Sequence, residues 1–327
     1  MILAGGGARR AAAVVRLAEA LDAPVAMTTN ARGLLPHDHP LGVSLSASMP
    51  ETRALIAGAD VVLALGTEFG PTDYDMYEDG GLHLPGFLIR VDIDPCQVLR
   101  GPAPGLGLTG DAGAAAEALL SAGARREPGD GARRAAAANA GRAHLPSAVR
   151  ADLALLDLVR DTLPGVLMAG DSTQAVYAGN IGFAAARPGG WFNSATGFGT
   201  LGYGLPAAIG AALGEGGPVV AFAGDGGLMF SLGELASATE AGVPVILLVL
   251  VNGGYGEIRS AMIARNVPPL GVDIFVPDLA AIASACGWAV AEADSPAALV
   301  SALTRAAARP GPSLILHDRR LREALAP

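Results

Sequence analysis

An uninterrupted apolar segment that ends in Gly-Asp-Gly is the feature that most constrains the fold of this chain. Residues 218–223 are apolar and β-rich throughout, as in strands buried on both faces of a parallel sheet. Such a strand delivers the motif at 224–226 to its carboxyl end, the edge where ligands bind in open α/β sheets. A second apolar run, 243–251, ends directly at Asn252. The spacing predicts two parallel strands that present Asp225 and Asn252 side by side.

The residue types at this edge suit a metal-bound diphosphate. Glycines around Asp225 let the backbone approach a phosphate without an intervening Cβ, and residues 231–241 predict a helix whose N-terminus faces the same point. Asp225, Asn252 and a backbone carbonyl supply the hard oxygen ligands that Mg²⁺ prefers. Because a lone Gly-Asp-Gly occurs in many turns, the prediction depends on the whole block 224–257.

Strand and helix patterns alternate along the rest of the chain. Short apolar runs that predict strands cover residues 2–4, 24–28, 60–66 and 87–92, and a helix–strand–helix–strand pattern covers residues 279–317. The alternation predicts an α/β fold with two doubly wound parallel-sheet domains, residues 1–122 and 149–320. Residues 123–148 lack a clean apolar stripe, so we predict a partly helical linker with its charges in water.

Composition excludes several classes of function. The chain has no lysine, which removes Schiff-base chemistry and the P-loop of nucleotide hydrolases. A formal net charge of −9 argues against a nucleic-acid partner. Two cysteines cannot build a disulfide framework, which fits a cytoplasmic location. The longest apolar run, 243–251, is about half of what a membrane-spanning helix needs, so we expect no membrane partner.

A glycine run near the start raises a nucleotide-binding alternative. Residues 5–7 are glycines that follow the first predicted strand, but Arg10 occupies the third glycine position of the dinucleotide fingerprint. A plain Rossmann dehydrogenase, which would bind a nicotinamide, stays open as an alternative. His37 and His39 lack acidic or cysteine partners at ligand spacing, so we predict structural roles for them.

The block from Gly224 to Arg259 combines Gly-Asp-Gly with Asn-Gly-Gly-Tyr-Gly-Glu-Ile-Arg. This block resembles the thiamin diphosphate motif of the acetolactate synthase and 2-oxo acid decarboxylase superfamily. The resemblance implies thiamin diphosphate as cofactor, with Mg²⁺ held by Asp225, Asn252 and Gly254. The cofactor-binding residues that it implies here are Gly224, Asp225, Gly226, Gly227, Asn252, Gly254, Tyr255, Gly256 and Glu257.

Two further segments carry the same resemblance. Residues 194–210 are similar to the family segment beneath the bend between the two cofactor rings. By that match the Gly199 carbonyl accepts from the 4′-amino group and Leu201 is the apolar wedge that bends the cofactor, which makes both catalytic candidates. Residues 171–174 correspond to diphosphate-side contacts. The cofactor-binding candidates in these segments are Thr173, Gln174, Gly197, Gly199, Thr200 and Leu201.

The first predicted domain, residues 1–122, is similar to the central domain of this superfamily through residues 28–42 and 92–95. That domain is mostly architectural in the family. Some members bind FAD or an adenosine nucleotide there, and the sequence gives FAD no support in this chain.

The family's third domain, a pyrimidine-binding domain with the glutamate that protonates the cofactor's N1′, has no counterpart in this sequence. Because Met1 falls at the first strand of the central domain, we expect a separate small subunit to supply that domain and its glutamate. The resemblance then implies a split enzyme, a heterotetramer in which this chain is the large, Mg-diphosphate-binding subunit. A truncated product is the alternative.

The expected reaction is loss of CO₂ from a 2-oxo acid, with an aldehyde or an acyloin as product. Pyruvate decarboxylases have an acidic residue where this chain has Ile258, which counts against that assignment. Residues 171–180 look closest to decarboxylases of larger substrates such as 5-guanidino-2-oxopentanoate, with Tyr177, Asn180 and Arg259 near the substrate or in packing roles. An acetolactate synthase-type carboligase subunit and a non-catalytic thiamin diphosphate-binding paralogue are the alternatives.

Overall fold

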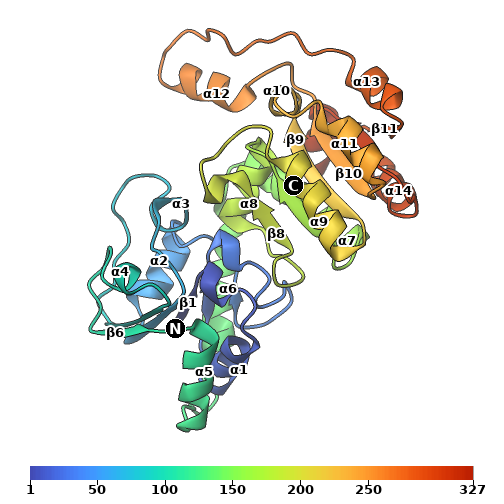
Figure 1. The fold of residues 1–327 in the computed structure, drawn as a ribbon. Helices are drawn as coiled ribbons and strands as arrows, with labels where there is room; N and C mark the ends of the chain where they lie inside the picture. The colour runs from blue at the N-terminus through green and yellow to red at the C-terminus, as the bar shows by residue number, and fades with distance from the viewer. Residues whose placement is uncertain (327) are drawn as a thin grey trace. The chain divides into compact units, whose positions relative to one another are not determined.

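The computed structural model describes residues 1–326, which fold into two compact units (Figure 1). Unit 1 comprises Met1–Leu145 together with Asn180–Trp191. Unit 2 comprises Pro146–Gly179 and the residues from Phe192 on. Each unit contains one six-stranded sheet with helices packed against it. The predicted α/β fold with two doubly wound domains is confirmed.

The sheet of unit 1 has the strand order 3-2-1-4-5-6 and every pairing in it is parallel. In sheet order the strands are β3 (Gly42–Val43), β2 (Val25–Met27), β1 (Ile2–Ala4), β4 (Val61–Leu65), β5 (Phe87–Asp92) and β6 (Leu106–Thr109). This order is typical of dinucleotide-binding folds, but strand order alone does not establish function.

Helices cover both faces of this sheet. The helical elements of unit 1 are η1 (Gly6–Ala8), α1 (Ala12–Ala20), η2 (Thr29–Ala31), α2 (Pro50–Ala57), α3 (Pro71–Tyr74), α4 (Pro95–Val98), α5 (Ala112–Ser121), α6 (Gly131–Asn139) and η3 (Ala140–His144). One apolar core joins α1 and α5 to the sheet, and a second core joins α2 and α6 to its other face. Asp94 and Asp111 cap α4 and α5 by accepting backbone N–H groups.

The glycine run after β1 serves close packing within unit 1. A Cβ on Gly5 would lie 2.1 Å from the carbonyl oxygen of Gly66, the residue after β4, and one on Gly7 would lie 2.9 Å from Gly66 Cα. Only glycine permits this approach of two strand ends. The run therefore has a structural explanation that requires no nucleotide.

Most of the segment for which we predicted a linker is folded into unit 1. Residues 131–144 form α6 and η3, and α6 packs on the same core as α2. Asn139 accepts from the Ser44 N–H at 3.0 Å and donates to the Gly42 carbonyl at 2.8 Å, so its amide satisfies the backbone around edge strand β3. The division between the units falls after Leu145, and these contacts hold the preceding helix to the sheet.

Residues 180–191 belong to unit 1 although they begin within helix α8 (Gln174–Gly182), most of which lies in unit 2. The fully buried Arg32 donates to the carbonyl oxygens of Asn180 and Phe183, and to that of Ser44 at 2.6 Å. Burial lowers the pKa of Arg32 to about 10, and Asp73 opposes that shift. One buried guanidinium therefore satisfies three buried carbonyls and holds this segment in place.

The sheet of unit 2 has the order β11-β12-β10-β9-β7-β8. The strands are β11 (Ala289–Ala293), β12 (Ser313–His317), β10 (Val245–Leu250), β9 (Val219–Gly224), β7 (Leu167–Gly170) and β8 (Trp191–Asn193). The five strands from β11 to β7 are parallel neighbours. Strands β9 and β10 are buried along almost their whole length, as predicted from their uninterrupted apolar sequences.

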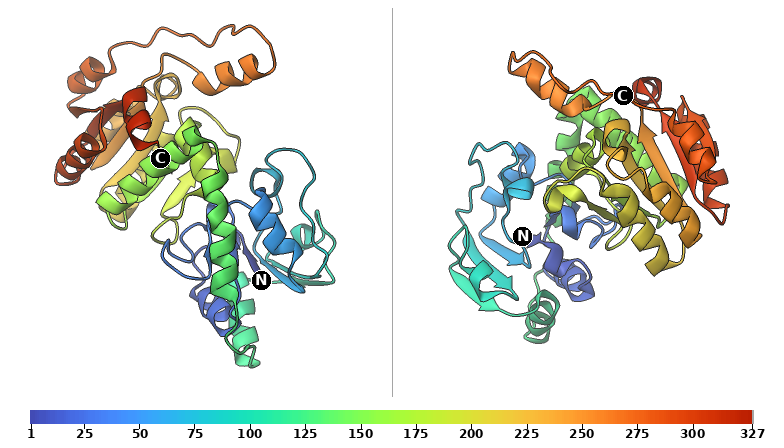
Figure 2. Two further views of the ribbon diagram at one scale, coloured as in Figure 1. Left: turned by 180° about the vertical axis from the view of Figure 1, so that it is seen from behind. Right: turned by 45° about the horizontal axis from the view of Figure 1, so that its top comes forward.

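The helical elements of unit 2 are α7 (Ser147–Thr162), α8 (Gln174–Gly182), η4 (Ser194–Thr196), α9 (Gly204–Glu215), α10 (Asp225–Leu228), α11 (Glu234–Ala241), α12 (Gly256–Ala264), α13 (Leu279–Ala285), α14 (Pro296–Ala307) and α15 (Arg319–Leu325). The helix predicted at 231–241 begins at Glu234. A separate short helix, α10, precedes it at Asp225–Leu228. Helix α12 has no buried residue and stands clear of the sheet in both views of Figure 2.

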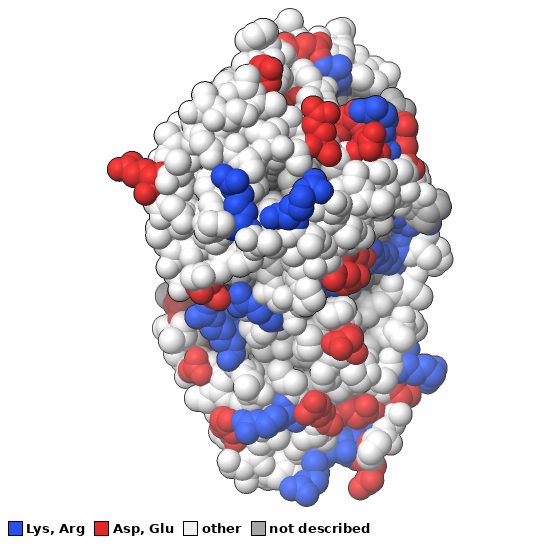
Figure 3. Space-filling model, turned by 90° about the vertical axis from the view of Figure 1, so that its right-hand side faces the viewer, with Lys and Arg blue, Asp and Glu red and all other residues white. Residues whose placement is uncertain are grey.

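Surface charge is mixed on the face shown in Figure 3, where acidic and arginine side chains are interspersed. The helices of the described chain lack the combination of length and apolar character that crossing a bilayer demands.

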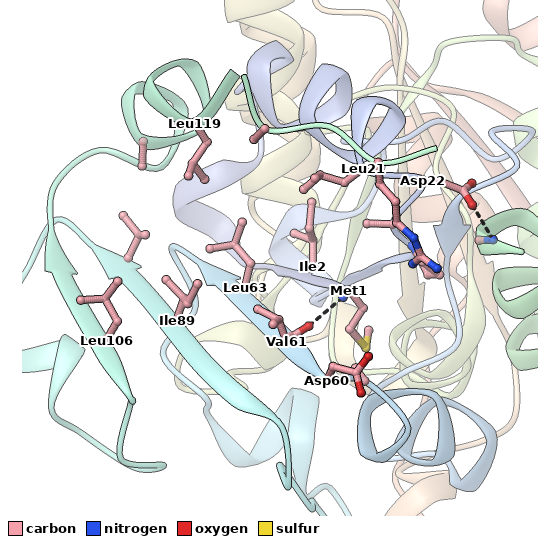
Figure 4. A pocket seen from close by; sticks show the side chains of 18 of the residues that line it. Met1, Ile2, Leu21, Asp22, Asp60, Val61, Leu63, Ile89, Leu106 and Leu119 are labelled. Carbon is pink, nitrogen blue, oxygen red and sulfur yellow. Dashed lines mark hydrogen bonds between the residues drawn. The ribbon is translucent and has the colours of Figure 1, made fainter. Parts of the chain in front are cut away.

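The largest cavity described lies in unit 1 at the amino-terminal ends of the strands, with a volume of about 660 Å³. Figure 4 shows its aliphatic lining, with Ile2, Leu63 and Ile89 on three strands and Leu119 on α5. It lies at the edge of the sheet opposite to the one where α/β folds bind nucleotides.

Candidate functional site

The predicted site residues of unit 2 gather at the carboxyl ends of three strands. β7 ends before Asp171, β9 ends before Asp225, and β10 ends two residues before Asn252. Between β7 and β9 the strand order reverses direction, since β8 lies on one side and β10 on the other. A switch point of this kind is the usual ligand crevice of an open α/β sheet.

Asp225 is fully buried and organises the loop after β10. Its Oδ1 accepts from the Gly226 N–H at 2.7 Å. Its Oδ2 accepts from the N–H groups of Asn252 at 2.8 Å and Gly253 at 2.6 Å. The carboxylate therefore fixes the loop that carries the predicted asparagine, and the two residues lie side by side as their spacing indicates.

The amide of Asn252 faces two other oxygen atoms. In the orientation that the structure gives, its oxygen lies 3.1 Å from Asp225 Oδ1 and 2.9 Å from the Gly254 carbonyl oxygen, with no donor between them. Rotating the amide would turn its nitrogen toward both acceptors. With the nitrogen inward the amide donates to both acceptors and the cluster is satisfied without a cation; with the oxygen inward three oxygens converge as the ligands of a cation would.

Glycines around this cluster are required by close contacts. Gly254 has φ +146°, and a Cβ there would lie 2.2 Å from the Val272 carbonyl oxygen. A Cβ on Gly256 would lie 2.7 Å from Asn252 Nδ2, and one on Gly226 would lie 3.0 Å from the Tyr255 ring. Any side chain at these positions would displace an atom of the oxygen cluster or its immediate support.

Asp171 is a functional candidate whose role in the loop could not be seen in the sequence. Its buried carboxylate accepts from the N–H groups of Ser172 at 2.7 Å and Gly202 at 2.9 Å, and more weakly from Gly204 at 3.4 Å. Burial raises its pKa, and these three backbone N–H groups oppose the shift. Asp171 therefore holds the glycine-rich loop, residues 197–204, at the end of β7. The sequence feature that indicates this role is the position of Asp171 directly after a buried strand, a position that Asp225 shares.

The glycine-rich loop presents its central residues to the open side of the site. Gly197, Phe198, Gly199 and Thr200 are all exposed. The Gly199 carbonyl accepts from Ser172 Oγ at 2.9 Å, and Ser172 Oγ also lies 2.8 Å from Ser194 Oγ. The Leu201 side chain packs next to Gly227, 3.5 Å from where a Cβ of that glycine would be. The loop therefore lies against the start of α10, beside Asp225.

Thr173 and Gln174 lie at the start of α8, next to the other predicted residues. A Cβ on Gly224 would lie 3.4 Å from Thr173 Oγ1. Gln174 Nε2 donates to Glu257 Oε2 at 3.3 Å, which joins α8 to the first turn of α12. The predicted residues of both sequence blocks therefore converge on one edge of the sheet.

The three residues suggested to lie near a substrate have different surroundings. Arg259 forms an ion pair with Asp273. The Asn180 side chain accepts from Trp191 Nε1 at 3.2 Å inside unit 1, so its role is packing. Tyr177 is half-buried, and burial raises the pKa of its phenol while a hydrogen bond with Ser172 lowers it. Of the three, Tyr177 has its partner among the site residues, since Ser172 also donates to the Gly199 carbonyl.

Residues 1–326 contain no group of three or more His, Cys, Asp or Glu side chains arranged to hold a metal. A cation at the site would therefore depend on amide and carbonyl oxygens besides Asp225. His39, in unit 1, instead accepts from the Leu41 N–H at 3.2 Å and lies 3.3 Å from Glu19.

A hollow at the carboxyl edge of the unit 1 sheet is where FAD would be expected. Its lining includes four acidic residues and no arginine; the acids are Glu68, Asp92, Asp94 and Asp111. Such a lining repels the diphosphate of a flavin or nicotinamide nucleotide. The residues present do not fit FAD, and they also disfavour the dehydrogenase alternative.

Comparison with known proteins agrees with this geometry. The model described as "Thiamine pyrophosphate enzyme, central domain" matches residues 1–119, and "Thiamine pyrophosphate enzyme, C-terminal TPP binding domain" matches residues 170–316. The chain belongs to the thiamine pyrophosphate enzyme family.

Among its relatives is the protein named "Probable 2-ketoarginine decarboxylase AruI" from Pseudomonas aeruginosa, 40% identical over 299 residues, covering 89% of this chain and 52% of the relative. Benzoylformate decarboxylase of the same organism is 32% identical over 94% of this chain and 58% of the relative. The chain thus spans little more than half the length of these proteins. The crystal structure of benzoylformate decarboxylase from Polynucleobacter necessarius superposes with a TM-score of 0.74 over 97% of this chain and 61% of that chain, at 23% identity, and supports the fold.

Proposed function

We propose that this chain binds thiamin diphosphate through Mg²⁺ and acts, together with a pyrimidine-binding domain on another polypeptide, as a decarboxylase or carboligase of 2-oxo acids. The observation that carries the proposal is the convergence of three groups, the Asp225 carboxylate, the Asn252 amide and the Gly254 carbonyl, with the inward end of the amide 3.1 and 2.9 Å from the other two oxygens. All three come from loops fixed by backbone hydrogen bonds and close glycine contacts.

The spacing of these oxygens fits Mg²⁺. Octahedral Mg²⁺ holds its ligands at about 2.1 Å, which places adjacent ligands about 3.0 Å apart. The inward end of the Asn252 amide lies 2.9 and 3.1 Å from the other two oxygens, a spacing that fits this value with the amide oxygen inward and an ordinary hydrogen bond with the nitrogen inward. One carboxylate and two neutral oxygens leave a net positive charge on the ion, which favours the oxygens of a diphosphate in the remaining positions.

The glycine-rich loop and the strand ends would hold the rest of the cofactor. When bound, thiamin diphosphate supplies the nucleophilic carbon and the electron sink for loss of CO₂. The proposed cofactor contacts of this chain are the Gly199 carbonyl and the Leu201 side chain. Ser172 donates a hydrogen bond to the Gly199 carbonyl, and Leu201 packs next to Gly227. Both lie on the open side of the site, where an aminopyrimidine ring would reach them.

Exposed apolar side chains border the site and favour a partner domain. Phe198 is 100% exposed, Phe275 85% and Leu270 84%, and α12 buries none of its residues. Exposed apolar side chains on segments that adjoin a site indicate an interaction surface. We propose that the pyrimidine-binding domain of the partner covers them and completes a hetero-oligomeric enzyme.

The substrate we propose is a 2-oxo acid with a long side chain. Ile258 on α12 is an exposed apolar residue where pyruvate decarboxylases carry an acid. The 40% identity to a protein named for 2-ketoarginine makes 5-guanidino-2-oxopentanoate the first candidate.

Reconstitution tests this function. The chain would be co-expressed with a pyrimidine-domain polypeptide, supplied with Mg²⁺ and thiamin diphosphate, and offered pyruvate, benzoylformate and 5-guanidino-2-oxopentanoate. We expect CO₂ release, with aldehyde or acyloin identifying decarboxylase or carboligase. Cofactor binding without CO₂ release from any 2-oxo acid would support a non-catalytic paralogue and contradict the proposal.

A further inference from the structure

Gln174 is connected to the interior of unit 2 by an arginine on helix α15 whose side chain is 19% exposed. Arg322 of α15 donates through Nη1 to Gln174 Oε1 at 2.8 Å and through Nη2 to Asp152 Oδ2 at 2.6 Å. Asp152 lies on α7 and is almost fully buried, with its side chain 4% exposed. Three helices that are distant in the sequence therefore meet at one guanidinium.

This guanidinium determines which way the Gln174 amide points. A glutamine amide has a donor end and an acceptor end of nearly the same shape, and only its partners decide their placement. Arginine has donors and no acceptor, so it holds the amide oxygen. The amide nitrogen is then directed to Glu257 Oε2, 3.3 Å away, on the first turn of α12. Gln174 and Glu257 both belong to the proposed cofactor-binding set.

Arginine suits this arrangement. Its planar fork places N–H groups of two separate nitrogens on two acceptors at once, whereas the ammonium of lysine would have to reach both acceptors from one nitrogen. Asp152 balances the charge of the arginine within the interior. The pair also faces His317 of β12, whose pKa is lowered to about 4 by burial and by Arg322, so this neighbour stays neutral at physiological pH.

We infer that Arg322 is a positioning residue, anchored by Asp152, that orients Gln174 and through it Glu257 for cofactor binding. The inference depends on the proposed function, since it assigns a role within the same site. A purely structural ion pair is the competing explanation, because it would explain the Arg322–Asp152 contact without any function for the bond to Gln174.

An apolar replacement of the pair separates the two explanations. Arg322→Met alone leaves a buried carboxylate unpaired and should destabilise the chain. Asp152→Leu combined with Arg322→Met removes both charges, and such exchanges commonly restore stability. The double variant therefore folds without a group to hold the Gln174 amide. Arg320→Ala on the same helix, whose side chain contacts only exposed Asp318 among its described partners, is the matched control.

The readout is the Kd of thiamin diphosphate for the full chain at saturating Mg²⁺, measured by calorimetry, with thermal unfolding alongside. We expect the double variant to unfold near the wild-type temperature and to bind about tenfold more weakly, the loss expected for one charge-assisted hydrogen bond. Gln174→Leu should give a similar loss, and adding it to the double variant should change the Kd no further. Arg320→Ala should bind as wild type does.

Recovery of wild-type affinity in the stable double variant would overturn the inference and leave a structural pair. Additive losses from Gln174→Leu and the double variant would also overturn it, since the arginine would then act by another route. Failure of the wild-type chain to bind thiamin diphosphate with Mg²⁺ would instead count against the proposed function and remove the premise.

Discussion

The inward end of the Asn252 side-chain amide lies 3.1 Å from Oδ1 of Asp225, at the ends of neighbouring parallel strands. The Asp225 carboxylate also accepts the Asn252 backbone N–H at 2.8 Å. One oxygen of the carboxylate therefore builds the loop while the other faces the asparagine amide.

Gly256→Ala tests the space around the asparagine. The new Cβ would lie 2.7 Å from Asn252 Nδ2, a movable side-chain end, so the amide must shift. Alanine is also a better helix former than glycine by roughly 1 kcal/mol, so stability should hold. We expect Mg²⁺-dependent affinity for thiamin diphosphate to fall about tenfold. Gly210→Ala in α9, with nothing within 4 Å of the new Cβ, is the control and should bind normally. Normal binding by Gly256→Ala would contradict the placement of the Asn252 ligand.

The buried His317 predicts a pH dependence of stability. Burial and Arg322 lower its pKa to about 4 from 6.5. As the pH falls below 6.5 the unfolded chain takes up a proton that the folded chain refuses, so folding loses about 2 kcal/mol by pH 5 from this group. The free energy of unfolding of His317→Asn, followed by urea denaturation, should decline less between pH 7 and pH 5 than that of the wild type. His37→Asn, an exposed loop histidine, should leave the wild-type slope unchanged; equal slopes for all three proteins would contradict the assignment.

Arg32→Met tests the contact that holds residues 180–191 in unit 1. Without the guanidinium, the carbonyls of Ser44, Asn180 and Phe183 lose a buried donor. We expect the stability of this unit to fall by about 3 kcal/mol or more. Amide hydrogen exchange in residues 180–191 should accelerate accordingly. The exposed Arg16, replaced by methionine, should cost less than about 1 kcal/mol. Unchanged protection of the segment in Arg32→Met would show that other contacts hold it.

Phe275→Ser tests the proposed partner surface. Phe275 is 85% exposed, so its loss should leave the stability of the chain and its own affinity for thiamin diphosphate unchanged. If the pyrimidine-binding partner covers this ring, the Kd between the two polypeptides should rise at least about tenfold, as for an aromatic hot spot. Ile93→Ser, at an exposed position of unit 1, is the control. Equal partner affinity for both variants would place the interface elsewhere.

Local sequence was sufficient to predict the strands and the proximity of Asp225 and Asn252. β9 and β10 are continuous apolar runs, and Asp225 and Asn252 stand at or just after their ends, so topology alone brings them together. The roles of Asp171, Arg32 and Arg322 could not be predicted in this way. Arg322 meets Gln174 across 148 positions of sequence, and such contacts depend on how helices pack rather than on any local pattern. The packing of the helix at 131–139 also depends on residues distant in the sequence. Asn139, for example, has its partner on the edge strand β3.

Titration of the full chain with thiamin diphosphate, with and without Mg²⁺, tests the central claim most directly. Asp225→Asn keeps the size of the side chain but removes the charge, and it should weaken Mg²⁺-dependent binding by about 100-fold or more, since loss of even an outer-shell partner costs 10–100-fold. The account predicts calorimetric binding by the wild type that requires Mg²⁺ and is abolished by chelation. Binding of equal strength without the metal, or in Asp225→Asn, would contradict it.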